Sequence, residues 1–411
     1  MIRWLEDAVA QECGAKAATM GALRRAGFPV PEGFVIPFSA YLGAVTRSAR
    51  QHAGADDDVL SGAGVPVIPP EMTEAIARHL SGWGGAPVAV RSSARDEDAQ
   101  GASAAGQYAT ALGAHDVGSV SAAVRTCWSS LHGDRARSYR HGLPRRPHPG
   151  PAMAVIVQRL VDARVSGVMF TSSPGRVTRI ECAWGLGIGT VGGTVDPDRY
   201  EVHGDGAVVR TIGRKLTRSD RSGETIRTRR VPMPQRVAPT LDDATARTVS
   251  GLGQDIADVL GAPQDIEWAM DRDGIWILQA RPVTADIPSP VSSTASAPLQ
   301  GIPGSRGIAC GPARIITGPA DFVRVRRGDI LVCRYTDPSW TPLLRAAAGV
   351  VTETGGALSH AAIVAREHGI PAVLGVPRAT SRITESAALT IDGARGTVEL
   401  HRPPTHPMEQ K

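Results

Sequence analysis

Two strand-like runs between residues 264 and 282 of this 411-residue chain carry oxygen ligands beside a guanidinium. Glu267 and Gln279 fall on what read as adjacent strands of a hairpin, and Arg281 follows Gln279 by two residues on the same face. Carboxylate and amide oxygens suit Mg²⁺ that is bound by nucleotide phosphates. We therefore predict a phosphate-linked metal site at this hairpin; solvated surface charge is the alternative interpretation of the fragment alone.

A second segment, VAVRSSARDED from Val88, places phosphate-binding side chain types after a buried strand. Arg91 is followed by Ser92 and Ser93, and three acids occupy positions 96 to 98. A guanidinium fork and neighbouring hydroxyls can meet phosphate oxygens. We expect Arg91, Ser92 and Ser93 to lie just beyond the end of this strand and to face an anion.

A third segment, residues 352 to 376, places a histidine at the start of a helix. Gly355 and Gly356 permit a tight turn, and Ser359 can cap the helix that follows. His360 is then the first helical residue, where unpaired N–H groups and a partial positive charge would stabilise a phosphoryl group carried on the imidazole. A partly exposed histidine near a helix cap is the plainer alternative.

Residues 349–376 resemble the phosphohistidine segment of the swivelling domain shared by phosphoenolpyruvate synthase, pyruvate phosphate dikinase and rifampicin phosphotransferase. GIPGSRGIACGPARI, from Gly301, resembles the opening of that domain, and DGARGTVEL, from Asp392, resembles its closing strand. The resemblance implies that His360 is transiently phosphorylated.

The N-terminal part is similar to the ATP-grasp nucleotide-binding domain of the same family. GAKAATMGALRRAGFPVPEGFVI resembles its first motif, VAVRSSA its arginine motif, and PQDIEW and LQARP its metal motifs. The resemblance implies ATP and Mg²⁺ as cofactors, with Glu267 and Gln279 as metal ligands. The implied nucleotide-binding residues are Lys16, Arg91, Gln158, Glu181, Glu267, Gln279 and Arg281.

Two positions depart from the family pattern. Ile188 stands where the family usually has the acid of GLGE, so one acidic contact to the nucleotide is missing. Ala104 stands where ASFAGQ would supply a phenylalanine, which changes how that loop packs on the nucleotide.

The elements that must position these residues are strands and helices in mixed order, which predicts an α+β or α/β multidomain fold. We expect an ATP-grasp domain over residues 1–285, with a subdomain break near 141–151. A Pro- and Ser-rich linker over 286–303 then leads to a swivelling β/α phosphohistidine domain over 304–402 and a tail over 403–411. Among the helices, we expect segments 14–25, 117–140, 240–260 and 360–367.

Composition excludes several other classes of protein. The five cysteines are scattered without a C-x-x-C pair, which argues against a disulfide framework or a zinc site. The net charge of +5 comes from dispersed arginines without interleaved aromatics, so we expect no nucleic-acid partner. No apolar run is long enough for a membrane span, and the acidic N-terminus is unlike a signal peptide; we expect a cytoplasmic protein without a membrane partner.

The resemblance implies a reaction in two stages. In the family, ATP phosphorylates the histidine through a pyrophosphoryl intermediate and gives AMP and inorganic phosphate, and the acceptor is phosphorylated at a second site. An 18-residue extended linker would reach about 50 Å, enough for such a movement. We expect no acceptor-binding domain here, because Thr284 leads through the linker straight into Gly304.

The acceptor is therefore open at this point. We expect a dikinase-type enzyme acting on a small molecule, for which a hydroxylated natural product or its precursor from specialised metabolism is one candidate. The alternatives are a half-enzyme that needs a separate acceptor-binding subunit, and a phosphocarrier or regulator that phosphorylates a protein.

Lysine is scarce, with Lys16, Lys215 and Lys411 the only three among 45 basic residues. Lys16 lies in the nucleotide motif, where a flexible ammonium can follow phosphate oxygens in a way that a planar guanidinium cannot. We expect this lysine to be functional and not a remnant of codon usage.

Overall fold

The chain folds into two compact units in a computed structural model. The structure describes residues 1–52, 66–97, 107–133, 136–137, 150–172, 177–223, 225–284, 288 and 299–401. The first unit comprises 1–187, 199–211 and 217–284, and the second comprises 188–198, 212–216 and 285–411. The mixture of strands and helices in both units confirms the predicted α/β class.

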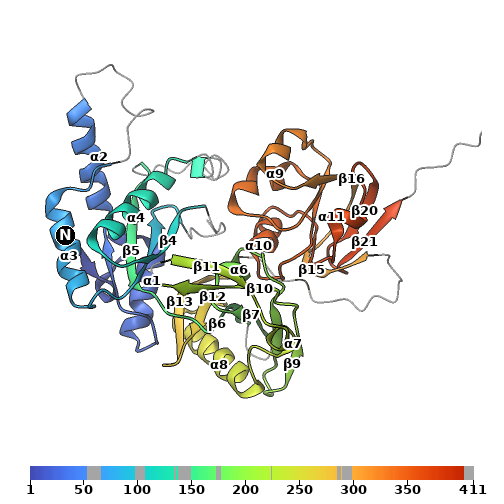
Figure 1. Cartoon of the computed structure of the whole chain (residues 1–411), viewed down its shortest axis with the longest axis horizontal. Coiled ribbons are helices and arrows are strands. Elements are labelled where there is room, and N and C mark those ends of the chain that lie inside the picture. The colour runs from blue at the N-terminus through green and yellow to red at the C-terminus, as the bar shows by residue number, and fades with distance from the viewer. Residues whose placement is uncertain are drawn as a thin grey trace, which may run out of the picture. The chain divides into compact units, whose positions relative to one another are not determined.

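An antiparallel five-stranded sheet forms one part of the first unit (Figure 1). Its order is β1 (Arg3–Trp4), β2 (Gly33–Ile36), β5 (Met153–Arg159), β3 (Val88–Ala94) and β4 (Thr110–Ala114). Its helices are α1 (Ala10–Arg25), α2 (Phe38–His52), α3 (Pro70–Ser81) and α4 (Val117–Ser130), and η1 (Leu5–Asp7) is a short 3₁₀ turn. Helices α1, α2 and α4 pack against this sheet, which is Val- and Ile-rich as buried strands require.

A six-stranded sheet forms the other part of the first unit. Its order is β13 (Ile275–Pro282), β12 (Gln264–Met270), β6 (Val165–Phe170), β7 (Thr178–Trp184), β8 (Asp198–Val202) and β9 (Val208–Thr211). Helix α8 (Asp243–Leu260) packs against β12, β6 and β7, the hairpin β10 (Thr217–Ser222) and β11 (Thr225–Arg230) is separate, and α7 (Met233–Val237) follows it. One hydrophobic core, which includes Trp128, Tyr200 and Trp268, connects both sheets.

An eight-stranded sheet organises the second unit. Its order is β14 (Leu299–Gln300), β21 (Thr397–His401), β20 (Ala388–Asp392), β16 (Ile308–Ile316), β17 (Ile330–Cys333), β18 (Gly349–Thr352), β19 (Ala372–Leu374) and β15 (Ile302–Ser305). Strands β16 to β19 are parallel, and the helical elements are α6 (Ile188–Val191), η2 (Pro319–Arg324), η3 (Pro338–Trp340), α9 (Thr341–Ala346), α10 (His360–Glu367) and α11 (Ala379–Arg382). Apolar residues of α9 and α10 pack against the parallel strands, so this part of the sheet carries the helix that begins with His360.

Three expected elements have different bounds in the structure. The helix expected over 117–140 ends at Ser130, and the helix expected from Gly14 begins at Ala10, with Gly14 as a break at φ +82°. Strand β3 continues through Ala94, so Arg91 lies inside a strand and not beyond its end. The buried strand β5 pairs with β3 as far as Ala94, which explains the longer strand.

Several expected boundaries fall outside the described residues. The break near 141–151, position 104, most of the linker and the tail after 402 belong to this group. Of the last residues of the expected linker, 299–300 form strand β14 and 302–303 begin strand β15. The four buried cysteines and the exposed Cys310 are free thiols, as expected, and no helix among the described residues is both long and apolar enough to cross a membrane.

Candidate active site

Arg91 holds together the residues of the predicted metal site. Its Nη2 donates to Glu267 Oε2 at 2.6 Å and to Gln279 Oε1 at 3.2 Å, and its Nη1 donates to the carbonyl of Leu278. The guanidinium comes from β3 of the first sheet, whereas Glu267 and Gln279 come from the β12–β13 hairpin of the second. The structure therefore brings together three of the residues that the sequence singled out.

The acidic and amide side chains form one row across the second sheet. Glu267 pairs directly with Gln279 on one side and with Val168 on the other, and Val168 pairs with Glu181. Directly paired residues point to the same face of a sheet, and strands are about 4.8 Å apart. Glu181 therefore shares the face of Glu267, with the two Cα atoms about 10 Å apart.

Three nearby cations affect the pKa of the Glu267 carboxyl. Burial alone would raise the pKa of its carboxyl, but the charges of Arg91, Arg281 and Lys16, together with the hydrogen bond from Arg91, outweigh burial and lower the pKa. The carboxylate is therefore ionised at neutral pH. A charged oxygen donor beside Gln279 is what a magnesium ligand requires.

Arg281 lies on the same hairpin but has a carboxylate partner of its own. Its Nη2 lies 2.7 Å from Asp265 Oδ2, and both side chains are at most 10% exposed. The pairing follows from the register, since Asp265 lies directly opposite Arg281. In this structure Arg281 contributes positive charge to Glu267 while Asp265 holds its guanidinium.

Lys16 is buried in the first unit and forms an ion pair with Glu97. The other carboxylate oxygen of Glu97, Oε2, accepts a hydrogen bond from the backbone N–H of Ala94 at 2.9 Å, which fixes the acid at the end of β3. Lys16 lies near enough to Glu267 to lower its pKa. Sequence reasoning noted an acid at position 97 but did not pair it with Lys16, because 81 residues separate them.

Ser93 positions the helix that carries Lys16. Its Oγ donates to the carbonyl of Cys13 at 2.7 Å and accepts from the N–H of Ala17 at 3.2 Å. Gly14 makes this approach possible, because a Cβ at this residue would lie 2.4 Å from Ser93 Oγ. The expectation that Ser93 faces a phosphate is therefore wrong; the fully buried hydroxyl is used inside the protein.

Gln158 and Ile188 are the remaining sequence-predicted positions on the nucleotide side. The buried Gln158 donates through Nε2 to the carbonyl of Pro31 at 2.9 Å, so its amide nitrogen holds the turn before β2. Ile188, at the position where the family usually has an acid, is 47% exposed at the start of α6. The nucleotide-binding role that the family resemblance implies for Gln158 and Glu181 stays a prediction.

An apolar cluster next to the charged row was missed by the sequence analysis. Val161, Ala163, Leu186 and Ala269 are its buried members. Leu160, Ile226, Trp276 and Leu278 pack against them. Ala269 follows Glu267 by two residues, so the cluster lies about 7 Å along the same face of β12. The members come from five separate chain segments, and no short motif connects them.

His360 is the first residue of α10 in the second unit, as predicted, but it is buried, with 3% of its surface exposed. Its Nδ1 lies 3.4 Å from Thr336 Oγ1. Ser359 occupies the N-cap position without capping the helix, because its hydroxyl donates to the carbonyl of Gly356 at 2.8 Å. Arg366 fixes the preceding loop by donating to the carbonyls of Ala357 and Gly304.

Two family profiles match the chain. Residues 10–297 match the AMP/ATP-binding domain of pyruvate phosphate dikinase, and residues 325–396 match the mobile domain of PEP-utilising enzymes. The chain therefore belongs to the pyruvate phosphate dikinase AMP/ATP-binding family and also carries the mobile domain of PEP-utilising enzymes, which confirms the family resemblance.

The curated relatives are named as phosphoenolpyruvate synthases. The Methanothermobacter thermautotrophicus protein, named a probable phosphoenolpyruvate synthase, is 36% identical over 94% of this chain and 61% of its own length. The Escherichia coli phosphoenolpyruvate synthase is 35% identical over 86% of this chain and 48% of its own length. The chain thus spans about half to three-fifths of the length of these two proteins.

The similarity of this chain to solved structures is weak. A D-alanine–D-alanine ligase from Coxiella burnetii matches at 9% identity over 66% of this chain and 48% of its own, with a TM-score of 0.29. A similarity this weak carries no argument, so the family assignment depends on the sequence profiles and relatives.

Proposed function

We propose that this protein is an ATP-dependent phosphotransferase that transfers phosphate through a phosphohistidine at His360, with AMP and inorganic phosphate as products from ATP. The observation that carries the proposal is the meeting of Arg91, Glu267 and Gln279 within hydrogen-bond distance in the unit that matches an AMP/ATP-binding domain. A guanidinium can bind nucleotide phosphates, and two neighbouring oxygen ligands can bind the metal that accompanies them.

The cationic side chains of the first unit would bind and neutralise the phosphates. Arg91 offers a fork that can exchange its contacts with Glu267 and Gln279 for phosphate oxygens, and Lys16 offers a compact charge on a flexible stem. Charge that spreads over phosphate oxygens in the transition state is stabilised by such preorganised cations. The apolar cluster around Ala269 provides a surface for the flat face of the base.

Glu267 and Gln279 fit Mg²⁺ by their donor chemistry. Among the described residues no group of three or more His, Cys, Asp and Glu side chains could hold a metal, so the hairpin offers two oxygen donors and not a full protein cage. Mg²⁺ is commonly bound in this way, through one or two protein ligands and the phosphates of a substrate. Bound there, it would neutralise phosphate charge.

His360 is proposed as the nucleophile. An unprotonated ring nitrogen attacks the β-phosphorus of ATP, the bond to the α-phosphate oxygen breaks and AMP leaves. Water then takes the terminal phosphoryl group from the pyrophosphorylated histidine as inorganic phosphate, and the phosphohistidine that remains divides the transfer to the acceptor into two steps. Thr336 lies on the Nδ1 side of the ring, and contact there would fix the ring orientation and leave Nε2 as the reacting atom.

The acceptor we propose is a small molecule, with a hydroxylated natural product or its precursor as one class to test. The relatives' name as phosphoenolpyruvate synthases makes pyruvate another test compound. A half-enzyme with a separate acceptor-binding subunit, or a phosphocarrier for a protein, remains the alternative. One measurement distinguishes a small-molecule acceptor from these alternatives. If the acceptor is a small molecule, adding it alone must increase AMP formation by the purified chain.

The proposed chemistry is tested by the products. Incubation with Mg²⁺ and ATP should give AMP and inorganic phosphate in equal amounts, measured by chromatography and ³¹P NMR. Formation of ADP as the nucleotide product would contradict a dikinase-type reaction, and omission of Mg²⁺ should abolish AMP formation.

A further inference from the structure

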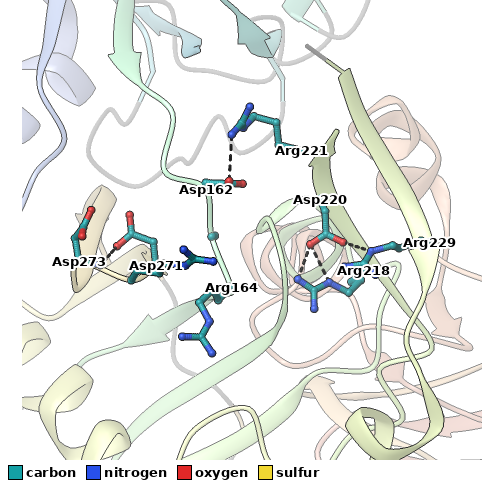
Figure 2. A pocket seen from close by; sticks show the side chains of 10 residues that line it. Asp162, Arg164, Arg218, Asp220, Arg221, Arg229, Asp271 and Asp273 are labelled. Atoms are coloured by element: carbon teal, nitrogen blue, oxygen red, sulfur yellow. Dashed lines mark hydrogen bonds and ion pairs between the residues drawn. The ribbon is translucent and has the colours of Figure 1, made fainter. Parts of the chain in front are cut away.

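A cleft of about 770 Å³ lies in the first unit, and none of the predicted nucleotide residues lines it. Its walls are the 162–164 segment before β6, the β10–β11 hairpin, and the 271–273 turn between β12 and β13 (Figure 2). Asp271 follows Glu267 by four residues, directly after the end of β12, so the cleft lies about 13 Å from the proposed metal ligand.

All three walls are fixed by hydrogen bonds. The 162–164 segment is held by the N–H of Arg164, which donates to the carbonyl of Met270 at 2.8 Å. The hairpin is held by the N–H of Leu186, which donates to the carbonyl of Ser219 at 2.8 Å. The turn is held by Asp271, whose Oδ1 accepts from two backbone N–H groups and the indole of Trp276. Hydrogen bonds within the protein therefore hold the walls of the cleft in place without a ligand.

Five arginines and four aspartates line the cleft, but their pairing is uneven. Asp220 binds Arg218 and Arg229, as Figure 2 shows, and Asp162 binds Arg221 at 3.2 Å. Burial would raise the pKa of Asp220, but the hydrogen bonds from its two arginines outweigh burial and lower the pKa, so this carboxylate remains charged. Three of the five arginines are therefore paired within the cleft, two of them with the same carboxylate.

Arg164 and Arg272 are the remaining two. The guanidinium of neither has a hydrogen bond or ion pair with any residue in the part of the chain that the structure describes, and no dashed line reaches Arg164 in Figure 2. Asp271 and Asp273 flank Arg272 in the sequence and also line the cleft. The Oδ1 atom of Asp271 accepts the hydrogen bonds that hold the turn. The five arginines and four aspartates of the lining give it a net charge of +1. Each of the two guanidinium groups without a partner among the described residues can bind two oxygens of a tetrahedral anion.

We propose that this cleft is a second, non-catalytic anion site, which binds a phosphate dianion through Arg164 and Arg272. The dianion can be inorganic phosphate or the phosphate group of a small organic ester, since the volume exceeds what a bare phosphate fills. The proposal does not depend on phosphotransfer at His360, because it concerns binding alone. It goes beyond the nucleotide site, whose predicted residues lie elsewhere on the first unit.

The test is calorimetric titration of the full chain at pH 8 and constant ionic strength, with inorganic phosphate and with glycerol 3-phosphate. We expect saturable binding of one equivalent by the wild-type chain, and at least about tenfold weaker binding by Arg164→Gln, Arg272→Gln double variants. Arg125→Gln, which removes an exposed arginine of α4 outside the cleft, is the matched control and should bind like the wild type. Tighter binding of the ester would assign the site to an organic phosphate, and equal binding would assign it to inorganic phosphate.

A second titration distinguishes this cleft from the nucleotide site. Ala163 belongs both to the cleft and to the apolar cluster, so the two sites share a wall and could be confused. We expect phosphate to bind with the same affinity when the chain is saturated with a non-hydrolysable ATP analogue. Loss of phosphate binding in the presence of the analogue, no binding by the wild type, or unchanged binding by the double variant would each overturn the proposal.

Discussion

The guanidinium of Arg91 and the carboxylate of Glu267 lie 2.6 Å apart although 176 residues separate them in the sequence. Their side chains are 14% and 21% exposed, so the pair is largely shielded from water and yet open on one side. The ion pair joins β3 of one sheet to β12 of the other. It therefore serves the fold and, in our proposal, the nucleotide phosphates as well.

Glu267→Gln should impair both roles. The amide keeps the shape but leaves Arg91 without its charged partner, so we expect the free energy of unfolding to fall by about 1 to 3 kcal/mol at pH 7. We also expect AMP formation to fall at least about a hundredfold, because the proposed metal ligand would lose its charge. Urea denaturation and product analysis measure the two effects, with the exposed Glu399→Gln as control.

The pH dependence of this stability difference follows from the lowered pKa of Glu267. A carboxyl whose folded pKa lies below its ordinary value of 4.5 stabilises the folded state above that value, and the contribution is lost as the pH falls through the folded pKa. The difference between wild type and Glu267→Gln should therefore be constant from pH 7 down to pH 6 and shrink below about pH 4.5. A difference that grows on acidification would contradict an ionised Glu267.

Lys16→Arg should reduce ATP turnover although it keeps the charge. Lys16 is 8% exposed and paired with Glu97, so a larger planar group must displace its surroundings or lose the pair. We expect AMP formation to fall at least about tenfold, with Lys411→Arg as the matched conservative control. Near-normal AMP formation by Lys16→Arg would show that the scarcity of lysine reflects codon usage alone.

Gly14→Ala should destabilise the fold at the break in α1. The residue has φ +82°, and an added Cβ would lie 2.4 Å from Ser93 Oγ and 2.9 Å from its carbonyl oxygen. We expect a loss of more than about 1 kcal/mol in the free energy of unfolding, measured in urea. Gly43→Ala in α2 is the opposite control, because an added Cβ meets no atom within 4 Å there; it should stabilise by about 0.5 to 1 kcal/mol.

The sequence predicts the site well where a motif is local. His360 begins its helix at the predicted residue, and Glu267 and Gln279 pair across the predicted hairpin, because turn glycines and strand alternation are encoded by neighbouring residues. Contacts between distant segments were not predictable in this way. Glu97 as the partner of Lys16, and Ser93 as the anchor of α1, depend on how β3 packs against the helix.

The length of β3 was also not predictable from the sequence. Arg91 was expected beyond the end of a strand, but β3 continues to Ala94 because β5 pairs with it along its whole length, whereas β4 pairs with it only as far as Arg91. The serines and arginine are polar, and a single sequence gives no sign that β5 pairs with β3 as far as Ala94. The apolar cluster of Val161, Leu186 and Ala269 was missed for a related reason, since its members meet only in the folded sheet.

The measurement that tests the central claim most directly is labelling with ATP that carries ³²P at the β position. The wild-type chain should acquire label that is lost in acid and retained in base, as a phosphohistidine requires, and His360→Ala should acquire none. His368→Gln, at the other end of the same helix, is the matched control and should be labelled like the wild type. Acid-labile label that persists in His360→Ala, or a folded wild-type chain that forms AMP without any label, would contradict the account.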